Sequence, residues 1–232
     1  FVGRIGQLRE ILNSFELGMG DRLPIAVDEM HSAPAFAIRR KDVPGIGLAI
    51  SLVVPRKLSD AENEAMSLLN HILNGTLHSR IQGEARRRGL LYYMWSQLST
   101  FEHNSSWDFG AQVSVSNLPA VVDLVTNEMQ RVKDGLVNET ELAEAKSYAM
   151  GRYQMGTQTV GQIAGWLADR YFFDGVIDDF SAVPARINAI SPEQIIETAR
   201  DIIRHNCWTL GLYGSTDKTM ADQLYDRFAK LF

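Results

Sequence analysis

The stretch from Leu68 to Thr100 constrains the fold most, because it contains signals for two helices, a turn and a strand in immediate succession. An apolar helical segment ends at Gly75, and a short polar turn follows. A second helix that carries Ser79-Arg80-Ile81 then continues into three consecutive arginines, and Gly89 is expected to end it. The next segment, LLYYMWSQLS, is rich in aromatic residues and is typical of a strand. The stretch therefore predicts a compact unit in which basic and phenolic groups gather.

The flanking sequence predicts an α+β fold, with helices packed on one face of a mostly antiparallel sheet. The order of signals is two strands, a helix, two strands, a run of helices and a last strand. Capping-box patterns mark helix starts at Ser59 with Glu62 and at Asn138 with Glu141, and Ser191 precedes a helix with proline at its first position. The expected strands are 34–40, 45–54, 90–99, 106–115 and 207–213, and the expected helices include 59–74, 118–133, 158–173 and one that begins after Ser191.

Charge and composition exclude several classes of protein. A net charge of −5 and a single basic cluster, Arg86-Arg87-Arg88, argue against a nucleic-acid partner. No apolar run reaches the length of a membrane span, and the N-terminus lacks a signal pattern, so the compartment stays open between cytoplasm and periplasm. The lone Cys207 has no internal disulfide partner and is expected to be a buried apolar residue.

Three segments in order resemble the pitrilysin/insulinase-type zinc metallopeptidases, a family that includes the mitochondrial processing peptidase. The first segment comprises Gly75, Ser79-Arg80-Ile81, Glu84, Arg86, Gly89-Leu90 and the Tyr92-Tyr93 pair. The second is Glu-Leu-x-x-Ala-Lys at 141–146, and the third is Ser191-Pro192-Glu193 before an Ala-Arg helix. Together the three matches cover roughly residues 34 to 215, which makes them more specific than any one alone.

The zinc-bearing half of that family carries H-x-x-E-H, in which two histidines hold the metal and the glutamate activates its water. None of the five histidines, His31, His71, His78, His103 and His205, continues to this motif. The resemblance therefore implies the non-zinc half of a metallopeptidase, with no catalytic residue, metal ligand or cofactor in this chain. Zinc is expected in a partner half that carries the motif, on the same chain or on a separate subunit, and the substrate is expected to be a peptide.

In the non-zinc half, the resemblance implies that Arg86 and Tyr93 bind substrate. An arginine offers fixed donors to a peptide carbonyl or carboxylate, and a tyrosine hydroxyl can donate to an oxyanion. A second register, anchored on Gly89, instead selects Tyr92 and aligns the arginine position with Ala85. From residue type alone, arginines on a short helix more often form a solvated face, and tyrosines at a strand start more often pack. We expect Arg80, Arg87 and Arg88 to be structural.

Two further expectations concern organisation and role. Residues 4–16 predict a helix with Ile5, Leu8, Ile11, Leu12 and Phe15 on one face. The resemblance implies that residues 1–33 form a helix and linker from a preceding half, and that residues 34–232 form the non-zinc domain. The chain is then part of a metalloendopeptidase but inactive in isolation. The alternative is a scaffold or interaction subunit of the same fold, since some members of this family have lost peptidase activity.

Overall fold

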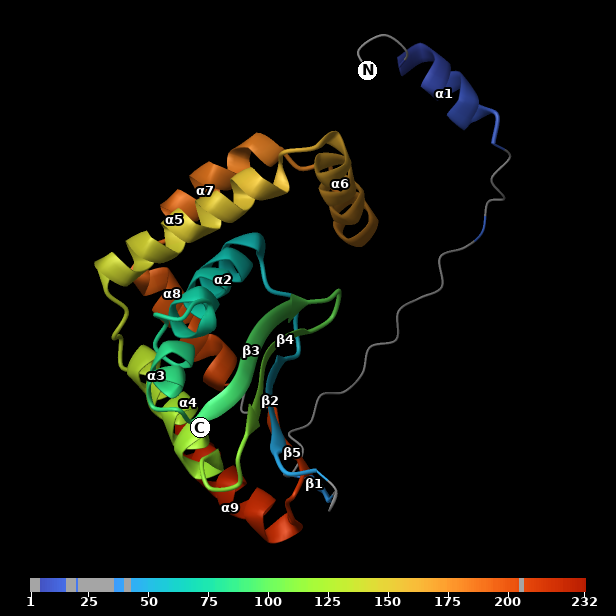
Figure 1. Ribbon diagram of the computed structural model, residues 1–232. Helices are drawn as coiled ribbons and strands as arrows, with labels where there is room; N and C mark the ends of the chain where they lie inside the picture. Colours follow the sequence, from blue (N-terminus) through green and yellow to red (C-terminus); the bar gives the residue numbers. More distant parts are fainter. Residues whose placement is uncertain (1–4, 16–19, 21–35, 40–42, 205–206) are drawn as a thin grey trace.

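The fold is a five-stranded sheet with helices on one face (Figure 1). The computed structural model describes residues 5–15, 20, 36–39, 43–204 and 207–232. The strands are β1 (Phe36–Arg39), β2 (Ile46–Val54), β3 (Leu91–Thr100), β4 (Ser105–Val113) and β5 (Trp208–Gly214). The helices are α1 (Ile5–Asn13), α2 (Asp60–Asn74), α3 (Gln82–Arg87), α4 (Leu118–Lys133), α5 (Glu139–Gly156), α6 (Val160–Asp174), α7 (Val183–Ala189), α8 (Pro192–Arg204) and α9 (Lys218–Phe228), with short 3-10 turns at Phe180–Ala182 and Ala229–Leu231. The predicted α+β class with a mostly antiparallel sheet is confirmed.

The strand order is β1-β5-β2-β4-β3, with β1 parallel to β5 and every other pair antiparallel. The first two strands of the sequence are not neighbours in the sheet, because β5 lies between them. A last strand can enter the middle of a sheet because strand order depends on long-range pairing and not on the turn at Pro44-Gly45. Among the described strands, β3 lies at the edge of the sheet and has β4 as its one neighbour.

The two faces of the sheet differ in the way that strand alternation requires. Residues 46, 48, 50, 52 and 54 of β2 are buried against the helices, as are residues 107, 109, 111 and 113 of β4. The largest buried side chain is Trp107, and α2, α4 and α8 supply most of the helical side of the core. The opposite face presents Tyr93 and Trp95 of β3 and Tyr213 of β5, all of which are exposed.

The predicted helix starts are confirmed at the level of individual hydrogen bonds. Ser59 and Glu62 form a reciprocal capping box on α2, and Asn138 and Glu141 form one on α5. Ser191 accepts a hydrogen bond from the Gln194 amide at the start of α8. Such caps satisfy amide groups that have no partner within a helix, so a local sequence pattern is sufficient to specify them.

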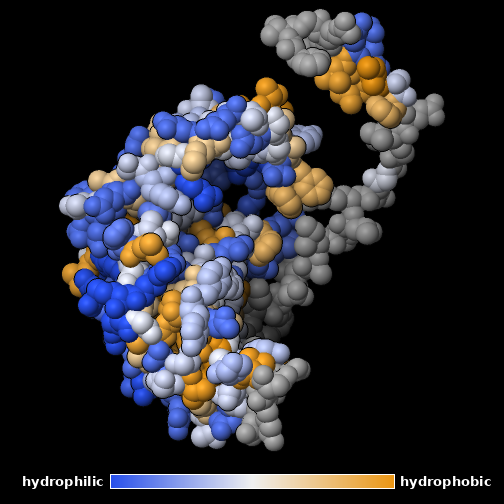
Figure 2. Space-filling model, in the orientation of Figure 1, coloured by the Kyte–Doolittle hydropathy of each residue, from blue (hydrophilic) through white to orange (hydrophobic). Residues whose placement is uncertain are grey.

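Several side chains lie in environments that local patterns did not predict. The helix predicted over 158–173 forms as α6, but it buries none of its residues, and Val160 is 85% exposed. Figure 1 shows α6 apart from the other helices, beyond the β3–β4 turn, and Figure 2 shows the surface hollowed between α6 and the rest of the domain. Cys207 precedes β5 and is half-buried, so the prediction of a fully buried residue within the strand is wrong; partial burial raises the pKa of its thiol.

The predicted N-terminal helix forms as α1, and its apolar residues Leu8, Ile11 and Leu12 are exposed, as is Phe15 just after it. Residue 16, where the predicted helix ends, and the expected boundary between residues 33 and 34 lie outside the described residues. Among the described helices, none is both long enough and apolar enough to cross a membrane.

Candidate functional site

The turn between α2 and α3 is built on the last turn of α2. The amides of Arg80 and Ile81 donate to the carbonyls of Ile72 and Leu73, and the Ser79 hydroxyl donates to the Thr76 carbonyl at 2.6 Å. The sequence placed Ser79-Arg80-Ile81 inside the second helix, and this is wrong, because these residues are tied back to α2 and α3 begins at Gln82. The turn fixes where α3 starts and therefore where its arginines point.

The Arg80 side chain is mostly buried and binds partners within the domain. Its Nε and Nη2 donate to the two carboxylate oxygens of Glu141 at 2.7 and 2.5 Å, and Nη2 also donates to the Leu136 carbonyl at 2.7 Å. Its Nη1 lies 3.7 Å from a Glu128 carboxylate oxygen. The hydrogen bonds from Arg80 hold the pKa of Glu141 below its usual value. Arg80 thus joins the turn after α2 to α4 and to the start of α5.

Arg86 and Arg88 are both exposed, and neither guanidinium has a hydrogen bond or ion pair with the part of the chain that the structure describes. Of the two, Arg86 lines an open hollow of about 620 Å³ together with His78, Gly83 and Glu84, and Arg88 does not. Arg87, in contrast, donates to Glu84 at 2.7 and 2.9 Å. α3 therefore presents a free guanidinium at residue 86 and an engaged one at residue 87.

A β-bulge at the start of β3 decides how the two tyrosines lie. Leu91 is opposite Val113 and Tyr93 is opposite Gln112, so Tyr92 is the extra residue. Gly89 precedes the bulge with φ of +63°, a left-handed conformation that favours glycine and turns the chain from α3 into β3. As a result, two consecutive tyrosines are both exposed, Tyr92 at 75% and Tyr93 at 60%. In a regular strand, one of the two would face the core.

Tyr93 lies on the open face of the sheet, beside Trp95. The Trp95 indole covers Gly110 of β4, where any side chain would meet its ring atoms at 2.2–2.6 Å. Gly110 therefore allows Trp95 to lie flat on the sheet next to Tyr93. In the Gly89-anchored register, the arginine position falls on Ala85, which is fully buried and cannot reach a ligand.

The three histidines that the structure describes, His71, His78 and His103, have different surroundings. His71 on α2 stacks on Tyr148 of α5 with ring centroids 3.9 Å apart, and its pKa is lowered by burial and by the nearby charge of Arg152. His78 lies beyond Gly75 in the turn, on the hollow that Arg86 lines. Within the described ranges, no group of three or more His, Cys, Asp or Glu residues is placed to hold a metal. His31 and His205 lie outside those ranges.

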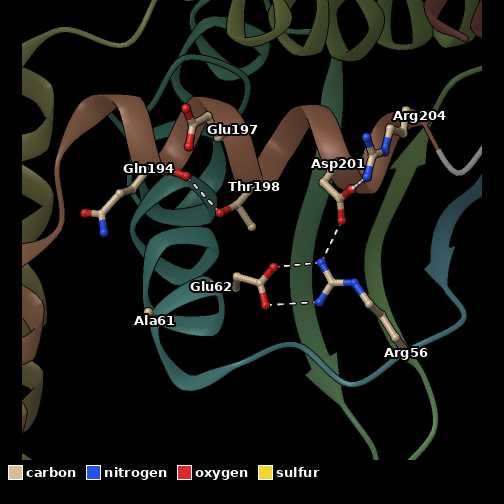
Figure 3. A pocket seen from close by; sticks show the side chains of 8 residues that line it. All are labelled: Arg56, Ala61, Glu62, Gln194, Glu197, Thr198, Asp201 and Arg204. Atoms are coloured by element: carbon tan, nitrogen blue, oxygen red, sulfur yellow. Dashed lines mark hydrogen bonds and ion pairs between the residues drawn. The ribbon is translucent and has the colours of Figure 1, made fainter.

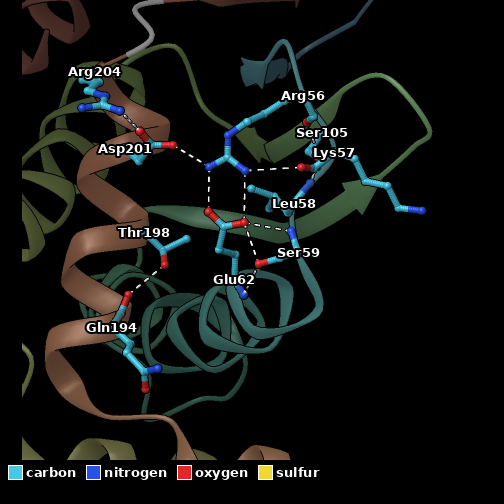
Figure 4. Close-up of polar contacts among 10 residues, drawn as sticks. All are labelled: Arg56, Lys57, Leu58, Ser59, Glu62, Ser105, Gln194, Thr198, Asp201 and Arg204. Atoms are coloured by element: carbon cyan, nitrogen blue, oxygen red, sulfur yellow. Dashed lines mark hydrogen bonds and ion pairs between the residues drawn. The ribbon is translucent and has the colours of Figure 1, made fainter. Parts of the chain in front are cut away.

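A second polar cluster, which the sequence did not predict, joins the start of α2 to α8 (Figure 3). Arg56 donates to both carboxylate oxygens of Glu62 at 3.0 and 2.7 Å and to Asp201 at 2.6 Å, and Arg204 also pairs with Asp201 (Figure 4). These groups line a hollow of about 450 Å³ together with Glu197. The lining carries three carboxylates and two cations, a net charge of −1, and both cations form ion pairs within it, so we interpret the cluster as a structural clamp.

This clamp predicts a specific loss of stability in acid. Arg56, followed by the backbone and hydroxyl of Ser59, lowers the pKa of Glu62 from 4.5 to about 2. A depressed carboxylate pKa stabilises the fold above pH 4.5, and this contribution is lost as pH falls towards 2. We expect Glu62→Gln to lower the free energy of unfolding by about 1–2 kcal/mol at pH 7. The variant should also lose less of its free energy of unfolding than the wild type between pH 5 and 2.

Urea unfolding at several pH values measures this effect. Glu197→Gln is the matched control, because Glu197 is an exposed acid on the same hollow. If the free energy of unfolding of Glu62→Gln falls between pH 5 and 2 as steeply as that of the wild type, the assignment of the clamp is contradicted.

Comparison with known proteins identifies relatives for most of the chain. Residues 15–148 match the family model described as the peptidase M16 inactive domain. A curated relative, an uncharacterized zinc protease of Streptomyces coelicolor, is 24% identical over 172 residues, which are 74% of this chain and 37% of that protein.

Solved structures share the fold. A protease from Helicobacter pylori aligns with a TM-score of 0.77 at 15% identity, over 92% of this chain and 52% of that one. A peptidase M16 inactive domain from Pseudomonas fluorescens aligns with a TM-score of 0.72 at 20% identity, over 85% of this chain and 48% of that one. A chain in the structure of Complex III2 from Candida albicans aligns with a TM-score of 0.80 at 14% identity, over 98% of this chain and 56% of that one. The chain thus spans about half the length of these solved chains.

Proposed function

The chain belongs to the peptidase M16 family, as an inactive domain of that family, and we propose that it binds the peptide which a zinc-bearing half cleaves. The zinc-bearing half carries H-x-x-E-H and lies either on the same chain or on a separate subunit. The curated relative is named a zinc protease and is matched over only part of its length, which supports a second half of this kind.

The observation that carries the proposal is the exposure of both Arg86 and Tyr93. A buried arginine needs internal partners to offset its loss of hydration, as Arg80 has in Glu141. Arg86 has no such partner among the described residues, and Tyr93 is 60% exposed although the next residue, Met94, is buried in the core. Neither side chain is therefore required inside the fold, and both are free to contact a ligand.

The chemistry of these two groups suits a peptide at the moment of cleavage. When zinc-bound water attacks a peptide carbonyl, negative charge develops on its oxygen, and a positioned donor stabilises that charge. The Tyr93 hydroxyl supplies a neutral donor, and the Arg86 guanidinium supplies charged donors for a neighbouring carbonyl or carboxylate. The chain contributes binding and transition-state contacts, and the partner half contributes the metal.

The edge of the sheet offers a path for the rest of the peptide. β3 is ten residues long and pairs with β4 along one side only. An extended peptide can add to such an edge through backbone hydrogen bonds, with alternate side chains specifying the sequence. A peptide on β3 would begin beside Tyr93 and follow the strand towards Thr100.

We retain the division of the chain as part of this proposal, with residues 34–232 as the peptide-binding domain and residues 1–33 as the end of a preceding half. The exposed apolar side chains of α1 support it, since a helix with one apolar face normally packs against another element.

The proposal predicts the behaviour of the isolated chain. Peptide hydrolysis at neutral pH needs an activated water or nucleophile, and this sequence has neither the H-x-x-E-H motif nor a recognisable nucleophile with its base. We expect the isolated chain, after exposure to zinc and dialysis, to retain no stoichiometric metal and to cleave no fluorogenic peptide. Atomic absorption and a peptidase assay measure both, and metal retention together with cleavage would reveal an active site within this chain.

A second candidate role, a scaffold subunit, is favoured by one observation. The fold also occurs in a chain of Complex III2, which is itself an assembly. The two roles differ in a single respect: only the peptide-binding role requires the side chains of Arg86 and Tyr93.

A further inference from the structure

A hollow of about 520 Å³ lies between the β3–β4 turn and α6, at the opposite end of β3 from Tyr93. Its base includes Leu58, which is buried, and its walls include Phe101, Trp166 and Phe173. Phe101 and Phe173 are each more than half exposed. The volume falls within the range of roughly 300–1,000 Å³ that is usual for ligand sites, and a largely apolar lining is typical of them.

The walls of this hollow are held in place before any ligand arrives. Arg170 of α6 donates to Asp60 at the start of α2 at 3.1 and 2.8 Å and to Asp174 at 2.6 Å, and Lys57 pairs with Asp174. The Trp166 ring packs edge-on against Phe180 with centroids 5.1 Å apart. α6 is thus attached to the domain by ion pairs at its end, while its aromatic side chains stay available on the hollow.

Charge narrows the class of ligand. The lining carries four carboxylates and two cations, so its net charge is −2 with His103 neutral. Both cations are engaged, Lys57 by Asp174 and Arg170 by Asp60 and Asp174. Asp169 is exposed at the rim and has no ion pair within the described residues. The site therefore favours an apolar group with a positive charge beside it and disfavours an acidic one.

The hollow is continuous with β3, since Thr100 ends the strand and Phe101 follows it in the lining. Tyr93 and Thr100 are seven residues apart on this strand, a span of about 23 Å at roughly 3.3 Å per residue. A peptide that lies along the edge of β3 and contacts Tyr93 reaches the hollow about seven residues away.

We propose that this hollow binds one large apolar side chain of the peptide, about seven residues from the residue held at Tyr93, and prefers a basic residue next to it. The inference rests on the proposed peptide-binding function and adds the sequence preference. Trp166 and Phe173 provide the apolar contact, and Asp169 provides the preference for a basic neighbour.

The test is a phenylalanine scan. Fluorescein-labelled 14-residue peptides of Thr, Gln and Lys carry a single Phe that moves one position at a time, and fluorescence anisotropy measures their affinity for the complete protein after removal of zinc by chelation. We expect one position, or two positions two apart, to bind about tenfold more tightly than the peptide without Phe. Phe173→Ser should abolish that preference, and Tyr171→Ser should retain it, because Tyr171 is equally exposed on α6 but does not line the hollow.

A second variant tests the charge. Asp169→Lys should weaken binding of the best Phe-Lys peptide severalfold and improve binding of its Phe-Glu counterpart. Measurable binding with the same affinity at every Phe position would overturn this inference while leaving the proposed function intact. A preference for one Phe position that persists in Phe173→Ser would do the same. Binding of none of the peptides would overturn both. Loss of association with the zinc-bearing half in Phe173→Ser, with the peptide preference unchanged, would assign the hollow to the partner protein and overturn the inference.

Discussion

Replacement of Arg80 by alanine is expected to lower the free energy of unfolding by about 3 kcal/mol, because it removes a mostly buried cation and leaves Glu141 without its ion-pair partner. The Arg80 side chain is only 10% exposed, and it supplies three hydrogen bonds to Glu141 and to the Leu136 carbonyl. Glu128, 3.7 Å from Nη1, is similarly buried. For a chain of 232 residues, this loss corresponds to a fall of roughly 6–12 °C in Tm.

Arg87→Ala is the matched control for this prediction. Arg87 also pairs with a glutamate, but its side chain is 73% exposed, and such a surface pair contributes about 0–1 kcal/mol. Chemical denaturation of the two variants measures the difference. Equal losses in Arg80→Ala and Arg87→Ala would show that the contacts of Arg80 do not stabilise the turn after α2.

Arg86→Ala and Tyr93→Phe are expected to have the opposite profile, with little effect on stability and a large effect on turnover. Each is expected to reduce kcat/KM of the enzyme assembled with its zinc-bearing half by about 100-fold, the typical cost of removing one transition-state donor. Because both side chains are exposed, the free energy of unfolding should change by no more than about 0.5 kcal/mol.

Controls on either side of these residues make the prediction specific. Arg88→Ala removes an exposed arginine two residues from Arg86, and Tyr92→Phe removes the hydroxyl of the bulged tyrosine. Both should retain nearly full turnover. A large loss in Tyr92→Phe with none in Tyr93→Phe would contradict the assignment and select the register anchored on Gly89.

The parts of the fold that could be predicted are those encoded over short distances. The capping boxes at Ser59 and Asn138 involve residues three apart, and the alternation of β2 and β4 repeats every second residue. Each signal is complete within one element. The helix and strand boundaries that they imply therefore agree with the structure to within a few residues.

The features that were missed depend on contacts between distant segments. β5 enters the sheet between β1 and β2 from more than 150 positions away, and Arg56 meets Asp201 across 145 positions. No local periodicity encodes either pairing. The exposure of α6 was missed for a related reason, since its apolar stripe satisfies a helical pattern but α6 buries no residue against the described part of the domain.

The residues of the candidate sites also fall into those that the sequence could predict and those that it could not. Arg86 and Tyr93 could be selected from a motif within one continuous stretch, whereas the hollow that Trp166 and Phe173 line with Phe101 could not, because its walls come from segments far apart in the chain. The bulge at Tyr92 is also invisible in a residue pattern. It is a property of the pairing between β3 and β4, and it leaves both Tyr92 and Tyr93 exposed.

Titration of this chain into its zinc-bearing half tests the central claim most directly, with wild type and the double variant Arg86→Ala/Tyr93→Phe measured in parallel. Light scattering records assembly, and cleavage of a fluorogenic peptide records turnover. If the chain binds substrate for the zinc-bearing half, both proteins should assemble with the same affinity, and only the wild type should raise turnover above that of the zinc-bearing half alone. Full turnover with the double variant, or with no added chain, would contradict the account and assign the chain a scaffold role.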